Sequence, residues 1–454
     1  MQLGDLIRHK KGFAFKSSDY RPSGVPVIRV SNFTEDSISS ADLKFVSLEV
    51  AGKNGDVALA VNDIVVATVG SWPNNPASVV GRTVSVPLWA NGSLMNQNSV
   101  ILRAKSGELA DQRFIYYQMK SAGFSAHIIS KAQGSANQAS ITLDAIFSFQ
   151  LWWPELSTRK EICSLLDAVD DRITLLRETN ATLEAIAQAL FKSWFVDFDP
   201  VRAKAEGRQP EGMDATTAAV FPDSFEESEL GSVPKGWSLV PFGELLVHTI
   251  GGDWGDESPN DKNDTRVAII RGTDIPDLQC GAANRVPVRY TSSKKLSTRK
   301  LQDGDLVLEV SGGSKDQPTG RALYLTDQLL GQFDCPVEPA SFCRLLRPIN
   351  RDIGVLLAQQ LTYIYSIGKT WEYQNQSTGI ANFQTVHFLA SELVAVPSPE
   401  VLEEFSAIVR PLIDRAHQSQ IRELTQLRDT LLPRLISGQL RLPEAEALVM
   451  GAEI

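Results

Sequence analysis

Two segments of the sequence are rich in residues that can hydrogen-bond to the edges of nucleic-acid bases. Amides suit adenine, basic groups suit guanine and carboxylates suit cytosine. The residues are Lys131, Gln133, Gly134, Ser135, Asn137 and Gln138 in the first segment and Gln374, Asn375, Gln376, Ser377, Gly379 and Asn382 in the second. Each segment lies just before the last apolar run of a globular unit. These residue types predict two loops that read a DNA sequence.

A turn rich in Gly, Ser and Asn that is held by its own amides would explain the same composition without a ligand. The matching position of the two loops in a repeat favours DNA contact, because Gly134 and Gly379 would let the backbone approach a phosphate. Arg29 and Arg271 suit either phosphates or structural salt bridges. Weaker candidates are Ser71, Trp72, Asn74 and Asn75 in one copy, Ser311, Ser314 and Lys315 in the other, and the basic residues Lys10, Lys11 and Lys16.

Motifs for catalysis are missing from the sequence. Gly368-Lys369-Thr370 resembles the end of a phosphate-binding loop, but Tyr363 stands where the first glycine is needed. The five histidines show neither a GxSxG nor a HExxH pattern, and the four cysteines form no CxxC pair. We therefore expect no cofactor, no metal, free thiols and no catalytic residue, so that any chemistry comes from partner proteins.

Composition indicates an ordinary globular chain of two or three domains. No apolar run is long enough for a membrane span, and the first residues lack the apolar segment of a signal peptide, so we expect a cytoplasmic protein without membrane contact. The net charge of −10 argues against nucleic acid at first sight. Residues 1–153 sum to +3 and residues 237–398 to −3, so the excess acid lies outside the two globular parts.

An internal repeat organises the chain. Residues 24–33 recur at 265–275 and residues 62–71 recur at 304–313, both at an offset of 242. Later segments match at offsets of 245 and 241, in the same order along the chain. Each copy consists of one globular unit with short β-branched runs, followed by one long helix. The chain is therefore predicted to be a tandem duplication.

A heptad stripe runs through the first long helix, where apolar residues alternate at spacings of three and four. Asn180 occupies a stripe position, where a polar residue fixes register and partner. About 40 residues at 1.5 Å per residue give a rod of about 60 Å. The residues assigned to the spacer or to partner contact are Asn180, Leu190, Phe191, Trp194, Phe195, Leu431 and Leu435. The aromatic residues among them suit either a partner surface or core burial, and Pro411 predicts a kink or late start in the second helix.

The predicted fold is α+β, with two similar mixed α/β domains separated by a two-helix antiparallel coiled-coil spacer and related by a pseudo-twofold axis. Two similar heads on a stiff rod suit a ligand that repeats at fixed spacing, as duplex DNA does. The predicted boundaries are domain 1 at 1–153, the first spacer helix at 154–200, a linker at 201–236, domain 2 at 237–398, the second spacer helix at 399–440 and a C-terminal tail at 441–454.

Three segments resemble conserved regions of the specificity subunits of type I restriction-modification systems. They are IAQALFKSWFVDFDPVRAK from Ile186, FPDSFEESELGSVPKGW from Phe221 and LRDTLLPRLISGQL from Leu427. The resemblance covers essentially the full length. It implies that each domain reads one half of a bipartite, asymmetric site in double-stranded DNA. It further implies that two methyltransferase subunits dock on the spacer and that two motor-nuclease subunits join for restriction.

Three hypotheses remain open from the sequence. The first is a non-catalytic DNA-recognition and scaffold subunit, which requires salt-sensitive binding to one split sequence. The second is a coiled-coil scaffold whose heads bind protein or carbohydrate and leave no DNA footprint. The third is a self-contained enzyme that turns over substrate alone. The bases that are read do not follow from one sequence.

Overall fold

The computed structural model describes residues 1–72, 79–135, 138–228, 231–283, 285–313, 317–377 and 380–451. The chain divides into two units, of which unit 1 comprises Met1–Asp171 with Gln426–Ile454 and unit 2 comprises Arg172–Thr425. Helices α6 (Leu156–Phe191) and α15 (Gln420–Ile436) each contribute residues to both units. Within the described ranges, no helix combines the length and the apolar character needed to cross a membrane.

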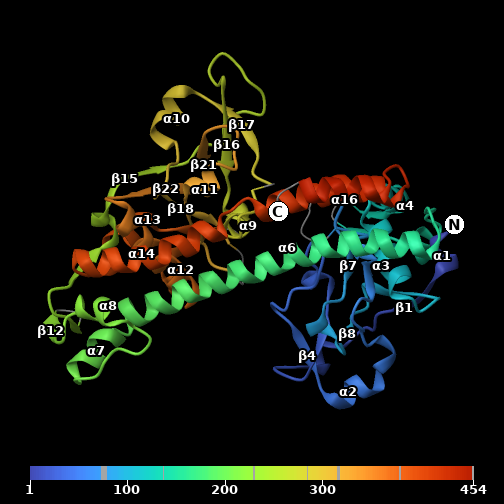
Figure 1. Cartoon of the computed structure of the whole chain (residues 1–454), viewed down its shortest axis with the longest axis horizontal. Helices are drawn as coiled ribbons and strands as arrows, with labels where there is room; N and C mark the ends of the chain where they lie inside the picture. The colour runs from blue at the N-terminus through green and yellow to red at the C-terminus, as the bar shows by residue number, and fades with distance from the viewer. Residues whose placement is uncertain are drawn as a thin grey trace. The chain divides into compact units, whose positions relative to one another are not determined.

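The described residues of unit 1 form three small sheets, with strand orders β1-β9-β5-β7, β2-β4-β3-β8 and β10-β11-β6 (Figure 1). Strand pairs are antiparallel except β3 with β8. The elements are α1 (Leu3–Leu6), β1 (Ile7–Lys11), β2 (Tyr20–Arg21), β3 (Val25–Ile28), β4 (Lys44–Val46), α2 (Leu48–Lys53), β5 (Ile64–Ala67), β6 (Val69–Gly70), β7 (Thr83–Ser85), β8 (Leu94–Met95), β9 (Ser99–Ala104), α3 (Leu109–Lys120), α4 (Ala122–Lys131), β10 (Gln133–Ser135), β11 (Gln138–Ser140), α5 (Leu143–Phe147) and α16 (Leu442–Gly451).

Unit 2 has the matching sheets β15-β22-β18-β20, β17-β16-β21 and β19-β24-β23, together with the pairs β14-β25 and β12-β13. Its one parallel pair among the described strands, β16 with β21, corresponds to β3 with β8. The elements up to the middle of the unit are α7 (Asp199–Ala205), α8 (Ala215–Ala219), β12 (Phe225–Ser228), β13 (Gly231–Pro234), β14 (Ser238–Pro241), β15 (Leu246–Gly251), β16 (Thr265–Ile270), α9 (Ile275–Gln279), β17 (Val288–Thr291), α10 (Ser293–Arg299), β18 (Leu306–Glu309) and β19 (Ser311–Gly312).

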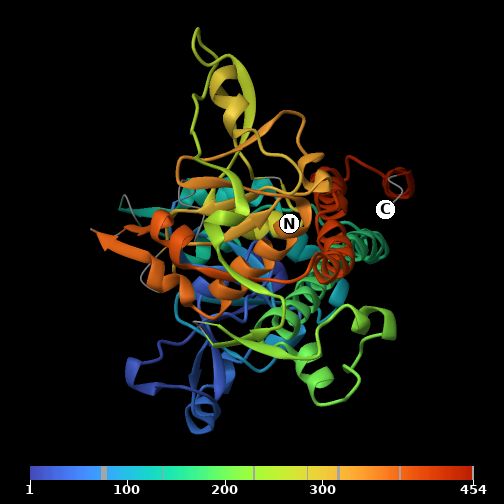
Figure 2. The same ribbon diagram turned by 90° about the vertical axis from the view of Figure 1, so that its left-hand side faces the viewer.

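The remaining elements of unit 2 are β20 (Ala322–Tyr324), α11 (Asp327–Leu330), β21 (Val337–Pro339), β22 (Cys343–Pro348), α12 (Arg351–Ser366), β23 (Gln374–Ser377), β24 (Ile380–Phe383), α13 (Thr385–Ser391), β25 (Leu393–Val396) and α14 (Pro399–Ala416). In both views α10, drawn in yellow, lies at the outer end of this unit (Figures 1 and 2). The strand orders of the two units agree, except that β2 has no counterpart among the described strands of unit 2. The segments matched at an offset of 242 lie on equivalent strands, β5 with β18 and β6 with β19.

Burial on both faces explains why the central strands read as continuous apolar runs. In β5, Ile64 and Val66 enter one core of unit 1 and Val65 and Ala67 enter the other. In β18, Leu306 and Leu308 enter one core of unit 2, whereas Val307 enters the second. Each central sheet therefore separates two apolar cores. The short sheets that contain β6 and β19 follow β5 and β18 directly in the chain, so the buried strands fix where the short sheets begin.

The helical segments differ from prediction at their ends. The α-helical part of the first long helix ends at Phe191, and a π-helical turn, Lys192–Val196, carries it on to α7. The second helix continues through Pro411 and breaks at residues 417–419, between α14 and α15. The break falls where the His417 side chain is bonded to the Thr326 hydroxyl at 2.9 Å. The expected tail at 441–454 forms α16, in which Ala445 is buried in the core of unit 1.

The expected linker at 201–236 is also folded. It forms α7, α8 and the β12–β13 hairpin, and its residues Val201 and Phe221 lie in the main core of unit 2 with the adjacent Trp237. The Lys204 ammonium donates to the Ala218 carbonyl at 2.9 Å. The segment was predicted to be a linker, but its large apolar side chains are enough to anchor it in the core.

Candidate nucleic-acid interface

The two predicted loops lie on equivalent three-stranded sheets, which we call the reading sheets (β10-β11-β6 in unit 1 and β23-β24-β19 in unit 2). In unit 1, Gln133, Gly134 and Ser135 of β10 are exposed, as is Gln138 of β11. The hairpin projects its amides into solvent because three strands of three or fewer residues bury little apolar surface. The reading sheet of unit 1 is thus an exposed polar platform.

Gly134 has a structural reason to be glycine that differs from the predicted one. Its φ is +157°, and a Cβ atom there would lie 2.0 Å from the Gln138 carbonyl oxygen across the hairpin. Its partner in the ladder is Ala139. The hairpin itself therefore requires this glycine, whatever ligand it meets.

The structure joins the first weaker loop of unit 1 to the reading sheet. The Trp72 indole N–H donates to the Ser135 carbonyl at 2.8 Å, and β6 pairs with β11. Ser71, in contrast, is only 7% exposed, so its side chain is a poor candidate for base contact, contrary to expectation. The Lys131 ammonium donates to the Ser148 hydroxyl at 3.1 Å, which directs it along the unit surface beside the hairpin.

In unit 2 the predicted amides are held by neighbours within the reading sheet. The side-chain oxygen of Gln374 accepts a hydrogen bond from the Thr319 backbone N–H at 3.1 Å. The side-chain oxygen of Asn375 accepts one from the Gln384 side-chain amide at 2.8 Å. The Asn382 side-chain oxygen accepts from the Ser311 hydroxyl at 2.9 Å, which brings the weaker loop of this copy to the main one. The side-chain oxygens of these three residues therefore already accept hydrogen bonds. The NH2 group of each side chain has two donor hydrogens in addition.

Several predicted residues lie outside the described part of the chain. They are Asn74, Asn75, Asn137, Ser314, Lys315 and Gly379. Gln376 and Ser377 belong to β23, but their side chains are not described.

The predicted basic residues do not all join the reading sheets. Lys10 forms an ion pair with Asp56, and the backbone N–H of Lys16 bonds to Asp19. Lys11 is exposed at the end of β1. Arg29 pairs with Asp42, and Arg271 pairs with Asp274 at 2.7 Å. Of the two predicted roles, phosphate contact or a structural salt bridge, both arginines have the salt bridge.

A buried carboxylate that the sequence did not single out supports the second reading sheet. Glu392 is fully buried and accepts from the Tyr373 hydroxyl at 2.6 Å and from the Gln360 amide at 2.7 Å, while Lys369 pairs with it at 2.7 Å. Burial and this carboxylate raise the pKa of Tyr373. Tyr373 and Lys369 belong to the short helix η9 (Lys369–Tyr373), which leads directly into β23. Glu392 therefore fixes the start of the hairpin.

The aromatic cluster of the first spacer helix is buried in unit 2, which decides between its two predicted roles. Phe191, Trp194 and Phe195 pack on Phe405 of α14, with Trp194 also edge-on to Phe221. Leu190 packs at the margin of this cluster. Together with the Asn180 amide, which donates to the Ala416 carbonyl at 3.0 Å, these contacts show that α6 and α14 run antiparallel within unit 2.

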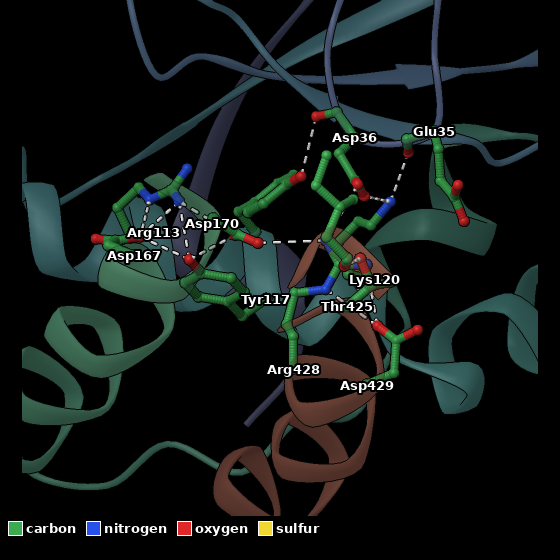
Figure 3. Close-up of polar contacts among 12 residues, drawn as sticks. Glu35, Asp36, Arg113, Tyr117, Lys120, Asp167, Asp170, Thr425, Arg428 and Asp429 are labelled. Atoms are coloured by element: carbon green, nitrogen blue, oxygen red, sulfur yellow. Dashed lines mark hydrogen bonds and ion pairs between the residues drawn. The ribbon is translucent and has the colours of Figure 1, made fainter. Parts of the chain in front are cut away.

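In unit 1 the stripe of α6 meets α15. Ile162 and Leu166 share a core with Leu431 and Leu435. A polar cluster lies beside this seam, in which Arg428 donates to Asp36 at 3.1 Å and to Asp170 at 3.2 Å (Figure 3).

The same cluster continues to α3. The Tyr117 hydroxyl donates to Asp167 at 2.6 Å and lies 2.9 Å from a carboxylate oxygen of Asp170, and Arg113 donates to Asp167 at 2.7 Å. Burial opposes ionisation of Asp36, but Lys120 and Arg428 lower its pKa below the usual value. Burial raises the pKa of Asp170. The network ties the globular part of unit 1 to both of its long helices.

Signs of a reaction centre are few in the described part of the chain. No group of three His, Cys, Asp or Glu side chains in it is placed to hold a metal ion. The four cysteines are free thiols, two of them buried.

Comparisons with known proteins agree with this geometry. Residues 1–185 match the family model described as type I restriction modification DNA specificity domain. The chain is 28% identical over 351 residues to the type I restriction enzyme HindI specificity subunit of Haemophilus influenzae, which covers 66% of this chain and 71% of that one. It is 22% identical to the MjaIX specificity subunit of Methanocaldococcus jannaschii, over 79% of this chain and 76% of that one.

Among solved structures, the S subunit of a type I restriction-modification system from M. genitalium superposes with a TM-score of 0.50 at 16% identity. The match covers 96% of this chain and 95% of that one. It supports the fold, a mixed arrangement of helices and strands with long helices.

Proposed function

We propose that this chain, a member of the family of type I restriction-modification specificity subunits, recognises a split DNA sequence with one reading sheet for each half. The observation that carries the proposal is the recurrence of one exposed, amide-bearing sheet at the same place in two units of the same strand order. A duplicated reader suits a target with two half-sites, and the differing residues of the two sheets suit halves of different sequence.

Base and phosphate contacts would divide between different residues. The exposed amides of Gln133 and Gln138 have the donor and acceptor pairs that recognise adenine in the major groove. The exposed amide of Asn382, whose oxygen accepts from the Ser311 hydroxyl, would offer its NH2 donors to a base. Lys11 and Lys131 would contact phosphates, which position a protein without conveying sequence. Because each globular part is close to neutral, the chain alone would bind weakly, and tight binding would require the bound methyltransferase subunits.

The long helices would act as the spacer. Helix α6 contains 36 residues, which corresponds to about 54 Å of rod. It contributes to both units, and its antiparallel contacts with α14 in unit 2 support the two-helix spacer with pseudo-twofold symmetry. We propose that two methyltransferase subunits dock on it, that two motor-nuclease subunits complete the restriction complex, and that these partners carry out methylation and cleavage.

Selection from random DNA tests the proposal. The purified complex with its methyltransferase partner is expected to enrich one bipartite sequence, with binding that weakens steeply as salt rises. A pool without enrichment would overturn the reading function and would favour a scaffold whose heads bind other ligands.

Removing one heptad from each long helix tests the spacer. Deletion of residues 172–178 together with 420–426 shortens the rod by about 10 Å, close to three base pairs of DNA. The enriched half-sites are expected to stay the same while the gap between them shortens. An unchanged gap would show that the helices do not set it.

A further inference from the structure

The turn that joins β21 to β22 in unit 2 lies against the reading sheet. The Phe342 carbonyl accepts from the Val310 N–H at 2.9 Å and from the Ser311 N–H at 3.3 Å. Ser311 begins β19 and pairs with Asn382 of β24. Phe342 therefore lies across β19 from Asn382, a predicted base-reading amide, although Phe342 was not among the residues predicted to bind DNA.

The side chain of Phe342 is 64% exposed, which is unusual for a large apolar ring beside a polar platform. Its neighbours are held firmly. Cys343 donates its N–H to the Ala340 carbonyl at 2.8 Å to close the turn, and the adjacent Ala340 N–H bonds to Ile270 at 2.8 Å. The backbone thus holds Phe342 at a fixed point while its ring remains open to solvent.

Unit 1 has the same turn with a different side chain. There the Asn98 carbonyl accepts from the Thr68 N–H at 2.9 Å, and Thr68 precedes β6 as Val310 precedes β19. Asn98 is exposed. The equivalent positions therefore offer an amide in one unit and an aromatic ring in the other.

A pair of glycines holds both turns in the same way. The Gly252 N–H donates to the Cys343 carbonyl at 2.9 Å, and the Gly12 N–H donates to the Ser99 carbonyl at 3.0 Å. A Cβ atom at Gly252 would lie 2.1 Å from the Pro339 carbonyl oxygen, and one at Gly12 would lie 1.9 Å from that of Asn96. This close approach leaves the turn little freedom, so a side chain at its tip is presented in a defined position.

We propose that Phe342 is a specificity-determining residue that contacts the 5-methyl group of a thymine in the half-site bound by unit 2. The inference rests on the proposed function. Thymine is the base whose major-groove edge carries a methyl group, and apolar side chains recognise it by contact. The amide of Asn382, which suits the major groove, lies across β19 from Phe342, whereas apolar wedges that unstack bases enter from the minor groove. Asn98, an amide at the equivalent point, would prefer adenine.

Replacement of thymine by deoxyuridine, which lacks only the methyl group, tests this contact in the complex with the methyltransferase partner. Once the target sequence is known, each thymine is replaced in turn. One replacement is expected to weaken wild-type binding about fourfold, as for one methyl group. Phe342→Ala should bind the parent DNA about that much more weakly and should no longer respond to that replacement.

Matched variants separate the possible failures. Asn98→Ala, at the equivalent position of unit 1, should keep the deoxyuridine response, as should Ile349→Ala, whose side chain is 52% exposed at the far end of β22. A target without a methyl-sensitive thymine, or a response that persists in Phe342→Ala, would overturn the role of Phe342. Those outcomes leave the proposed function intact. The proposed function fails only if the wild-type complex selects no sequence at all.

Discussion

The side-chain amide of Asn180 donates a hydrogen bond of 3.0 Å to the Ala416 carbonyl, the last of α14, and a second of 3.2 Å to the Cys280 carbonyl. Asn180 is buried in the apolar stripe of α6. It thus satisfies a helix terminus at the point where the second long helix breaks, because the last carbonyls of a helix lack partners within it.

Asn180→Leu is expected to lower the free energy of unfolding by about 1–3 kcal/mol, since it leaves two carbonyls without their donor. Urea denaturation followed by circular dichroism measures the change. Thr179→Leu, the same replacement at the exposed neighbouring position, should change it by less than about 0.5 kcal/mol. Equal effects at the two positions would argue against a capping role.

Removal of the Arg428 guanidinium should destabilise unit 1 strongly. Arg428→Met leaves the carboxylates of Asp36 and Asp170 without this partner in a largely buried site, and loss of one member of a buried ion pair costs about 3–5 kcal/mol. The double variant Asp36→Asn/Arg428→Met is expected to recover part of the loss, as measured by urea denaturation. Arg434→Met, on the exposed side of α15, is the control. Additive effects of the two substitutions would contradict a coupled network.

Glu338 of β21 should make the stability of unit 2 depend on pH. It is 0% exposed, and neither carboxylate oxygen has a hydrogen-bond partner within the described structure. Burial and the nearby Asp253 raise its pKa from 4.5 to about 7, against the attraction of Arg299 and Lys295. Between these values the unfolded chain releases a proton that the folded chain keeps, so stability falls as pH rises from 4.5 to about 7 and then levels off.

Glu338→Gln removes this dependence and is expected to gain about 3 kcal/mol over the wild type at pH 8, with little difference at pH 4. Thermal unfolding at the two pH values measures it. Glu244→Gln, at an exposed position of the same unit, should behave as the wild type. A pH-independent difference would mean that the carboxyl does not titrate in this range.

Weakening the support of the second reading sheet should reduce selectivity for one half-site. Glu392→Gln removes the charge that Lys369 pairs with, and a hydrogen bond to a charged group is worth about 1.5–3 kcal/mol. Discrimination at the half-site read by unit 2 is expected to fall about tenfold, while that at the other half-site persists. Competition binding with DNA altered in each half measures both, and Glu372→Gln, exposed in η9, is the control. A loss shared by both halves would instead indicate general unfolding.

Much of the architecture could be predicted from the sequence because the repeat preserves residue types that pack. The offset of 242 places β5 on β18 and β6 on β19, and the continuous apolar runs of β5 and β18 follow from burial on both faces. Asn180 was also recognisable from a local pattern, because it is the one polar residue in the apolar stripe of the first long helix. Patterns of this kind arise from local geometry, which a sequence records.

Other features depended on contacts between distant residues. Glu392 is one carboxylate among many in the sequence, and its partner Gln360 lies 32 residues away. Phe342 was missed because its counterpart is Asn98, so the repeat shows no similarity at this position. The folded segment 201–236 was misjudged through its prolines, although Phe221 and Trp237 were signals that could have corrected the prediction.

Unit 1 is assembled from both ends of the chain, with residues 426–454 completing a core begun by residues 1–171. During synthesis the whole of unit 2 is translated before Leu431 and Leu435 become available to pack on Ile162 and Leu166. Unit 2, being continuous, can mature earlier. The core that is begun first is therefore completed last, because Ile162 and Leu166 stay uncovered until Leu431 and Leu435 have been synthesised.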